Sequence, residues 1–363
     1  MASIQKRDTG RWRARYRDAT GREHARHFDR KIDAQRWLDE VTASIVTGQY
    51  VDPKAGKVTF DAYFRDWSTR QVWIESTARA MDLTRRSVPF GNTPLKALRA
   101  SQLEAWVKSM TTAGLAPTTV ASRMNGVRAA LGAAVRDRLI ADDPSKGVKL
   151  PRRRRAEAAM TIPTTDQVGA LLDTSDPYRR PLVALAAFAG LRLGEASAVQ
   201  LRDVDFLRRQ LAVTRQVQRR AGGGLDVRPP KYGSERVVFL PDGLVQLLAR
   251  HVEEFGVSGD GWLVAGGAGS ALPPTTANQW WTTTCRAAGV DGIRFHDLRH
   301  FYASGLIAAG CDVVTVQRAL GHANATTTLN TYSHLWPTAE DRTRTAAADL
   351  FAAAQPTTWR SHG

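Results

Sequence analysis

The chain has 363 residues, which at about 150 residues per domain allows two or three domains and excludes a single small module. Lysine and arginine number 51 against 35 aspartates and glutamates, so the net charge is +16, while 43% hydrophobic content is typical of a folded globular protein. Such an excess of positive charge favours a polyanionic partner, nucleic acid first, because binding to phosphates releases counterions.

The cysteines and apolar runs narrow the class of protein further. Cys285 and Cys311 cannot build a disulfide framework, and neither has a neighbour at metal-ligand spacing. The longest apolar run, residues 181–191, is about half of a membrane span, and the N-terminus has no apolar signal region. We therefore expect neither secretion nor a membrane partner, and a reducing cytoplasm fits.

The first predicted domain, residues 1–55, opens with an alternating run. Residues 11–17 place Trp12, Ala14 and Tyr16 on one face of a strand. A turn, a return strand over residues 22–28 and a helix follow, which together predict a small sheet backed by one helix. The opposite strand face is either solvated or binds DNA, and its uniform charge favours DNA. This arginine face consists of Arg11, Arg13, Arg15 and Arg17.

The second predicted domain, residues 58–150, shows only helical patterns. Thr59 is the expected N-cap of a helix whose aromatic stripe is core, and Ser101–Thr111 opens with a Ser-Gln-Leu-Glu capping box. A third helix is predicted over Pro117–Arg138. Its polar side is either a solvated face or a DNA-facing one, and the arginines on it are Arg123, Arg128 and Arg136.

A basic linker is predicted at residues 151–159, where four arginines follow a proline; it is either solvated or crosses the DNA backbone. Residues 160–363 predict a mixed α+β domain, with a capped helix after Thr165 and an apolar helix over residues 181–188. Strand-like runs at Leu211–Val217 and Arg236–Leu240 predict a small antiparallel sheet. The whole chain is thus expected to be multidomain, mainly α with small antiparallel β-sheets.

Polar groups that could do chemistry gather toward the C-terminus. His296 and Arg299 are three residues apart, so on one helix face they could converge on a single anion. His296 and His300 lack an intervening glutamate base and a third ligand, so no metal site is predicted. Upstream, Arg192 follows a glycine break, and Glu195 either pairs with it structurally or orients it into a pocket.

Three segments in order carry a family resemblance. They are Gly-Leu-Arg-Leu-Gly-Glu at 190–195, His-Asp-Leu-Arg-His at 296–300 and Leu-Gly-His-Ala-Asn-Ala-Thr-Thr-Thr-Leu-Asn-Thr-Tyr-Ser-His at 320–334. Each is weak alone, but the ordered set resembles the catalytic domain of tyrosine recombinases of the phage integrase family. The N-terminal sheet and helix resemble the arm-type DNA-binding domain of these enzymes, and the segments around residues 114–120 and 140–144 resemble their helical core-binding domain.

The resemblance implies a role for each matching residue. Two guanidiniums would clamp the scissile phosphate as fixed forks, so no metal or other cofactor is expected. A phenol of pKa about 10 is a poor nucleophile until such cations stabilise the phenolate. The implied set is Tyr332 as nucleophile, Arg192 and Arg299 as clamp, His296 as acid/base group, His322 as second phosphate-contacting imidazole and Lys231 as general acid, with Glu195 and His300 in support.

Lys231 can also be argued without the family. After Lys149 the chain uses arginine instead of lysine everywhere except at this position, in a Gly/Pro-marked turn between the two strand-like runs. Lysine can donate a proton to a leaving oxygen and recover it, whereas arginine cannot. The alternative is sequence drift at an exposed hairpin tip.

Together these features predict a site-specific DNA recombinase that integrates or excises a phage or mobile element, through a 3′-phosphotyrosyl intermediate and a Holliday junction. The resemblance implies a homotetramer on double-stranded DNA with core-type and arm-type sites, a DNA-bending host factor, an excisionase, and a place at the nucleoid of a bacterial cytoplasm. Two alternatives stay open: a telomere resolvase or type IB topoisomerase, and a catalytically inactive DNA-binding regulator. A helix at residues 345–354 is expected to pack on its own domain or on a neighbouring protomer.

Overall fold

The computed structural model describes residues 2–18, 21–46, 55–151, 160–220, 223–230, 233–336 and 339–354. These residues form mainly helices, with three small antiparallel sheets, as predicted. The predicted linker at 152–159 and Lys231 lie outside the described residues. The chain separates into two compact units, residues 1–158 and 159–363.

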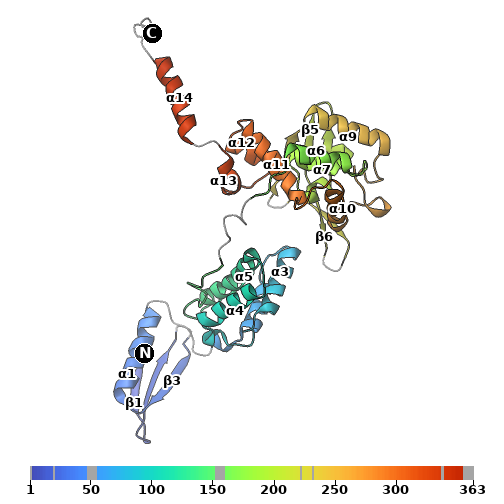
Figure 1. Ribbon diagram of the computed structural model, residues 1–363. Helices are drawn as coiled ribbons and strands as arrows, with labels where there is room; N and C mark the ends of the chain where they lie inside the picture. Colours follow the sequence, from blue (N-terminus) through green and yellow to red (C-terminus); the bar gives the residue numbers. More distant parts are fainter. Residues whose placement is uncertain are drawn as a thin grey trace. The chain divides into compact units, whose positions relative to one another are not determined.

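The N-terminal sheet is backed by one helix (Figure 1). Its antiparallel strands, in the order β1-β2-β3, are β1 Ser3–Lys6, β2 Trp12–Arg17 and β3 Glu23–Phe28, and the helix is α1 Lys31–Val46. Ala14 and Tyr16 of β2 are buried against Ala34 and Leu38, which confirms the predicted alternation. Strand β1 was not predicted, because four residues with no alternation carry no strand signal.

The helical part of the first unit has its own hydrophobic core. Phe60, Phe64 and Trp67 are buried in it together with Met124 and Leu131, so the aromatic stripe is core, as predicted. The helices are α2 Phe60–Thr69, α3 Glu75–Ser87, α4 Ala100–Thr112 and α5 Pro117–Arg136, with short 3₁₀ turns η1 Ala55–Lys57 and η2 Leu95–Ala97.

Two of the predicted helix ends in this part differ from the structure. The N-cap at Thr59 is confirmed, since its hydroxyl accepts the Ala62 backbone N–H at 3.3 Å. The capping box at Ser101 is wrong: α4 begins one residue earlier, and the Gln102 side chain accepts the backbone N–H of Arg99 at 2.9 Å. Helix α5 ends at Arg136, because Arg138 takes a left-handed φ of 55°.

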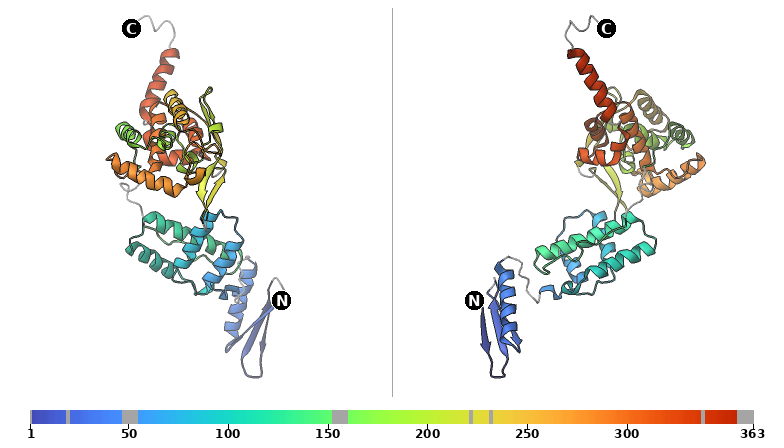
Figure 2. Two further views of the ribbon diagram at one scale, coloured as in Figure 1. Left: turned by 90° about the vertical axis from the view of Figure 1, so that its right-hand side faces the viewer. Right: turned by 60° about the vertical axis from the view of Figure 1, so that its left-hand side comes forward.

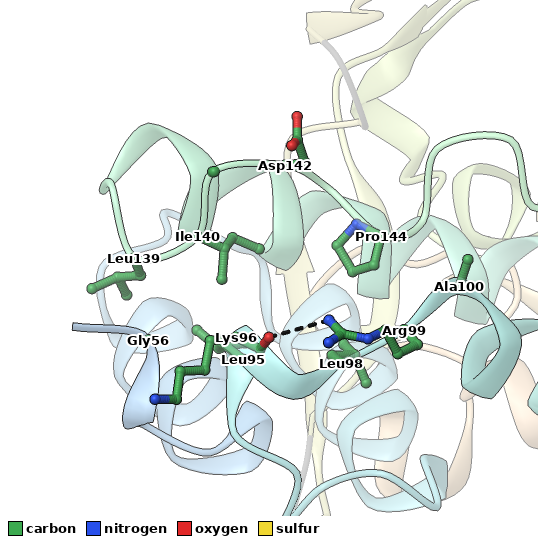
Figure 3. A pocket seen from close by; sticks show the side chains of 11 residues that line it. Gly56, Leu95, Lys96, Leu98, Arg99, Ala100, Leu139, Ile140, Asp142 and Pro144 are labelled. Carbon is green, nitrogen blue, oxygen red and sulfur yellow. Dashed lines mark hydrogen bonds between the residues drawn. The ribbon is translucent and has the colours of Figure 1, made fainter. Parts of the chain in front are cut away.

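A pocket of about 420 Å³ lies between η2 and the segment after α5 (Figure 3). Leu95 and Leu98 line one side, and Leu139, Ile140 and Pro144 line the other. The two segments therefore approach each other without filling the space between them.

The second unit builds its main core from helices around a small sheet (Figure 2). Within this core α7 Arg180–Ala189 packs against α11 Phe295–Ala308, and both are rich in buried apolar side chains. The helices are α6 Thr165–Thr174, α7 Arg180–Ala189, α8 Leu193–Ala196, α9 Asp242–Phe255, α10 Pro274–Ala287, α11 Phe295–Ala308, α12 Val313–Leu320, α13 Ala325–Tyr332 and α14 Ala339–Ala354. The N-cap of α6 is Thr164, one residue before the predicted start.

The strand-like run predicted at Leu211–Val217 is two strands in two different sheets. The chain leaves the first sheet at Arg215, whose side chain pairs with Asp203 at 2.5 Å. The Lys231 position therefore follows a separate hairpin, residues 216–228, and precedes the strand that begins at Arg236. The predicted antiparallel sheet is confirmed, because residues 210–213 pair with residues 236–239. The first sheet has the order β4 Val204–Asp205, β5 Gln210–Val213, β8 Arg236–Phe239, and the second pairs β6 Gln216–Arg219 with β7 Leu225–Arg228.

Helix α14 is longer than the predicted 345–354, with 16 residues. Its apolar anchors Leu350 and Phe351 are 72% and 63% exposed, so most of each side chain is uncovered. None of the helices in the described ranges is both long and apolar enough to cross a membrane.

Candidate active site

The predicted site residues of the second unit come from four places in the fold. Arg192 precedes α8, and α11 carries His296, Arg299 and His300 along its first turns. His322 follows α12, and Tyr332 ends α13. Apart from Lys231, whose position is not described, the structure brings all of these side chains to one site.

Glu195 is held between two arginines. Its Oε1 accepts a hydrogen bond from Nη1 of Arg192 at 2.7 Å, and its Oε2 accepts one from Nη2 of Arg236 at 2.9 Å. Burial alone would raise the pKa of Glu195, but the two guanidiniums lower it to about 2. The side chain of Arg192 keeps 31% exposure, so Glu195 orients an arginine that solvent can still reach.

Arg236 is a site residue that the sequence analysis missed. Its side chain is 6% exposed, and its Nε donates to the carbonyl of Ala319 at 3.0 Å, beside the turn that carries His322. No local signal could have found it, because its partner Glu195 lies 41 residues away in the sequence.

Arg299 is 1% exposed, and its guanidinium donates hydrogen bonds to two separate turns. Its Nη1 donates to the carbonyl of Gly190 at 2.5 Å and its Nη2 to the carbonyl of Leu320. Gly190 and Gly321 end α7 and α12 with left-handed φ values of 66° and 63°. A Cβ atom at Gly190 would lie 2.5 Å from the Tyr302 ring, so both the φ value and the close approach require glycine.

Tyr332 is 1% exposed, and its hydroxyl lies 2.7 Å from Nδ1 of His300 in a hydrogen bond. Burial raises the pKa of Tyr332 to about 12, while the charges of Arg299 and Arg192 act in the opposite direction. Tyr332 is therefore a neutral phenol whose hydroxyl is bonded to His300, not to His296.

The other two predicted histidines flank this pair. His296 is exposed, and its ring stands edge-on to His300 with centroids 4.8 Å apart. The His322 ring lies parallel to Tyr332 at 6.5 Å, and its Nδ1 is 2.9 Å from the hydroxyl of Thr328. Desolvation, followed by the charges of Arg299 and Arg192, lowers the pKa of His322 to about 4. His322 is therefore neutral near pH 7.

The site has an excess of positive charge. The guanidiniums of Arg192, Arg236 and Arg299 act on the titrating groups of the site. Among the described residues, two buried carboxylates, Glu195 and Asp297, oppose them. Such a site suits a phosphodiester, because the phosphate brings one negative charge and gains more as it reacts. No group of three His, Cys, Asp or Glu side chains that could hold a metal ion occurs in the described part of the chain.

The arginine face lies on one side of β2, as the alternation predicts, and part of its charge is paired. Arg11 pairs with Asp29 at 2.9 Å, Arg13 pairs with Glu23 at 3.3 Å, and Arg15 donates to Ser3 at 2.8 Å. Arg17, at the end of the strand, is exposed.

The three arginines predicted on α5 are not equivalent. Arg128 is half-buried and donates to the carbonyl of Val148 at 2.7 Å, so it holds the segment after α5 in place. Arg123 is half-buried, and Arg136 is exposed. Of the three, Arg136 is the best placed to meet a ligand in solution.

Two family patterns match this chain. The pattern of the phage integrase family matches residues 163–338, and that of the phage integrase N-terminal domain matches residues 2–47. The first range contains every residue of the site above, and the second contains the arginine face.

Two solved structures share the fold at low identity. The Tn1549 transposon integrase in complex with transposon right end DNA aligns with a TM-score of 0.71 and 19% identity, over 81% of this chain and all of that chain. A lambda integrase tetramer bound to a Holliday junction aligns with a TM-score of 0.57 and 18% identity, over 89% of this chain and 96% of that chain.

Two relatives are similar over most of their length. A protein named as an integrase of prophage phiRv2 in Mycobacterium tuberculosis is 28% identical over 96% of this chain and 94% of that protein. Tyrosine recombinase XerC of Mycobacterium sp. strain JLS is 31% identical over 79% of this chain and 92% of that protein. With the tyrosine, arginines and histidines of the motifs gathered at one site, the chain belongs to the phage integrase family and is a tyrosine site-specific recombinase.

Proposed function

We propose that this recombinase integrates or excises the DNA of a phage or mobile element, with Tyr332 as its nucleophile. The observation that carries the proposal is the burial of the Tyr332 hydroxyl among histidines and within the field of Arg192 and Arg299. A site in which the guanidiniums of Arg192, Arg236 and Arg299 outnumber the carboxylates of Glu195 and Asp297 has the charge to bind a phosphodiester and to stabilise its transition state.

The proposed reaction keeps the energy of the phosphodiester bond. Oη of Tyr332 forms a bond to phosphorus while the bond to the 5′-oxygen breaks, and the leaving oxygen takes a proton from an acid, for which Lys231 is the candidate. The products are a 3′-phosphotyrosyl link and a 5′-hydroxyl, so rejoining to a new strand needs no nucleotide cofactor. Arg192, whose side chain is partly exposed, would contact the incoming phosphate first. The other phosphate contacts would come from Arg299, His296 and His322.

We further propose double-stranded DNA with core-type and arm-type sites as the substrate, and a homotetramer that passes through a Holliday junction. The lambda integrase tetramer bound to a Holliday junction supports this assembly through its similar fold. A DNA-bending host factor and an excisionase remain proposed partners on the strength of the family resemblance, as does a place at the bacterial nucleoid. The domain boundaries at residues 55, 150 and 160 also belong to this proposal.

A suicide DNA substrate tests the nucleophile directly. A nick beside the scissile phosphate lets the 5′ product diffuse away, so the covalent complex accumulates. Tyr332→Phe removes one oxygen and should abolish trapping while DNA binding persists. Tyr178→Phe is the matched control, because Tyr178 lies in the same unit and its hydroxyl accepts the Ala265 backbone N–H at 2.8 Å. If Tyr332→Phe still forms the adduct, the nucleophile is another residue.

The same assay separates the alternatives. A catalytically inactive DNA-binding regulator would bind DNA and form no adduct even as the parental protein. A type IB topoisomerase would relax supercoiled plasmid efficiently without joining two DNA partners, and a telomere resolvase would leave hairpin ends. A recombinase instead joins strands from two duplexes, which is the expected result.

A further inference from the structure

The hydroxyl of Tyr332 lies where water cannot serve as its base. The residue is 1% exposed, and among the described residues the hydrogen-bond partner of Oη is Nδ1 of His300, at 2.7 Å. A phenol must lose its proton to become an effective nucleophile, and a buried phenol needs an acceptor within the protein. The acceptor must therefore be a side chain already in contact with Oη.

The neighbouring histidines are poorly placed for this task. The ring of His322 lies face to face with Tyr332, with an interplanar angle of 15°, and its Nδ1 is bonded to Thr328. His296 lies one helical turn before His300 on α11 and stands edge-on to it, at 80°. Of the three rings, His300 presents a nitrogen to the phenolic oxygen.

We propose that His300 is the general base for Tyr332, and that His296 serves the phosphate instead. This inference rests on the proposed nucleophile. In cleavage, the proton of Tyr332 passes to Nδ1 of His300 as Oη bonds to phosphorus, and the displaced 5′-oxygen takes a separate proton from the general acid. In rejoining, the 5′-hydroxyl attacks phosphorus, and the imidazolium of His300 returns its proton to Oη as Tyr332 leaves. The neutral imidazole must carry its proton on Nε2.

The groups around His300 keep its imidazole neutral, so that it can accept a proton. Desolvation lowers its pKa, the carboxylate of Asp297 opposes this shift, and the guanidiniums of Arg294 and Arg299 add to it. His300 is therefore neutral near pH 7. Arg299 and Arg192 lie close enough to Tyr332 to stabilise a phenolate once the proton has moved.

His300→Asn tests the base without removing the contact, since the asparagine oxygen can occupy the place of Nδ1 and accept a hydrogen bond but not a proton. The full chain is assayed on nicked DNA with a 5′-bridging sulfur, whose departure needs no acid, so the rate reports on the nucleophile. Cleavage should fall by about 10²- to 10⁴-fold while DNA binding is retained. His334→Asn, in an exposed histidine two residues after Tyr332, is the matched control and should cleave at the parental rate.

A fluorinated tyrosine at position 332 separates proton transfer from positioning. Fluorine lowers the pKa of the phenol, so the acidified nucleophile should restore cleavage in His300→Asn to within about tenfold of the parent while changing the parent little. Equal effects in both backgrounds, or a His300→Asn rate within about threefold of the parent, would overturn the assignment of His300.

A measurement on the parental protein covers the case in which His300→Asn does not fold. In the full chain labelled with ¹⁵N-histidine, Nδ1 of His300 should show the chemical shift of an unprotonated nitrogen, and it should move in Tyr332→Phe. A protonated Nδ1 overturns the inference. Trapping in Tyr332→Phe would instead refute the proposed nucleophile, so the two failures are distinguishable.

Discussion

Nη2 of Arg236 donates a hydrogen bond to Oε2 of Glu195 at 2.9 Å, and the two side chains are 6% and 1% exposed. Because the same carboxylate also holds Arg192, and Arg236 also binds the carbonyl of Ala319, this pair joins three parts of the site. The position of Arg192 therefore depends on a residue of β8 that need not touch DNA.

Arg236→Met should lower both stability and cleavage. It leaves the buried carboxylate of Glu195 with one cationic partner, and breaking a buried pair in this way costs about 3–5 kcal/mol. Chemical unfolding of the second unit and single-turnover cleavage would measure the two effects. Cleavage should fall further than DNA binding, because Arg192 loses its orientation while most DNA contacts stay.

The matched control for this experiment is Arg209→Met, in the pair of Arg209 with Asp242, which are 58% and 70% exposed. An exposed pair contributes about 0–1 kcal/mol, so stability and cleavage should barely change. Similar losses in the two variants would contradict a special function of Arg236.

Acid should destabilise the second unit in two stages. The pKa of His322 is lowered from 6.5 to about 4, so between these values the unfolded chain binds a proton that the folded chain does not, and stability falls as pH drops. The pKa of Glu195 is lowered from 4.5 to about 2, so its contribution is lost as pH falls through that lower range. Hydrogen-exchange protection of α11 and α13, taken relative to the intrinsic exchange rate at each pH, should fall from pH 7 to pH 5, and less steeply in His322→Gln. A steeper dependence in His322→Gln would contradict the assignment.

Local patterns predicted much of the fold. The aromatic stripe on α2 and the N-cap at Thr59 depend on residues a few positions apart, and both are confirmed. The run Leu211–Val217 was misread as one strand, because its division depends on Arg215 reaching Asp203 of a preceding turn. Strand pairing is a long-range property that local alternation does not carry.

Long-range contacts also limited what the sequence could predict about the candidate site. Motif order could be read from the sequence. The spacing of Arg192 and Glu195 predicted that they meet, either as a structural pair or with Glu195 orienting Arg192 into a pocket. The bond between His300 and Tyr332 spans 32 residues, and the bonds of Arg299 reach carbonyls on two other turns. His296 and His300 lie on one face of α11. Which of them bonds to the Tyr332 hydroxyl depends on how α13 packs, and the spacing of residues on α11 does not predict that packing.

Deletion of residues 1–55 should remove binding to arm-type sites and spare cleavage at core-type sites. The N-terminal sheet and α1 have their own hydrophobic core, and the arginine face is on that sheet. Gel-shift titration of the truncated protein on both classes of DNA site measures the effect, with cleavage at a core-type site as the control. Unchanged affinity for both classes would refute the division of labour.

Leu350→Ala combined with Phe351→Ala should weaken assembly more than DNA binding. The two side chains are 72% and 63% exposed on α14, so they are available to a neighbouring protomer. Native gels should show fewer higher-order complexes and unchanged single-site binding, whereas Asp349→Asn on the same helix should change neither. Equal loss of both kinds of complex would count against packing in trans.

Lys231→Arg should separate charge from proton donation. The substitution keeps a cation near the phosphate, so DNA binding and its salt dependence should barely change. If Lys231 is the general acid, expulsion of the 5′-oxygen loses its proton donor, and cleavage of ordinary DNA should fall by about 10²- to 10⁴-fold. Lys231→Ala should cleave no faster than Lys231→Arg.

A 5′-bridging sulfur in the substrate supplies the deciding comparison for Lys231. A thiolate leaves without a proton, so this DNA should restore cleavage in Lys231→Arg, whose defect lies in the leaving group. It should not restore cleavage in His300→Asn or Tyr332→Phe, whose defects lie in the nucleophile. If Lys231→Arg cleaves ordinary DNA at the parental rate, or if sulfur fails to rescue it, Lys231 is not the general acid. The acid is then another group near the leaving oxygen. His296, at the first turn of α11, is the next candidate if the bound phosphate raises its pKa, which desolvation lowers to about 4.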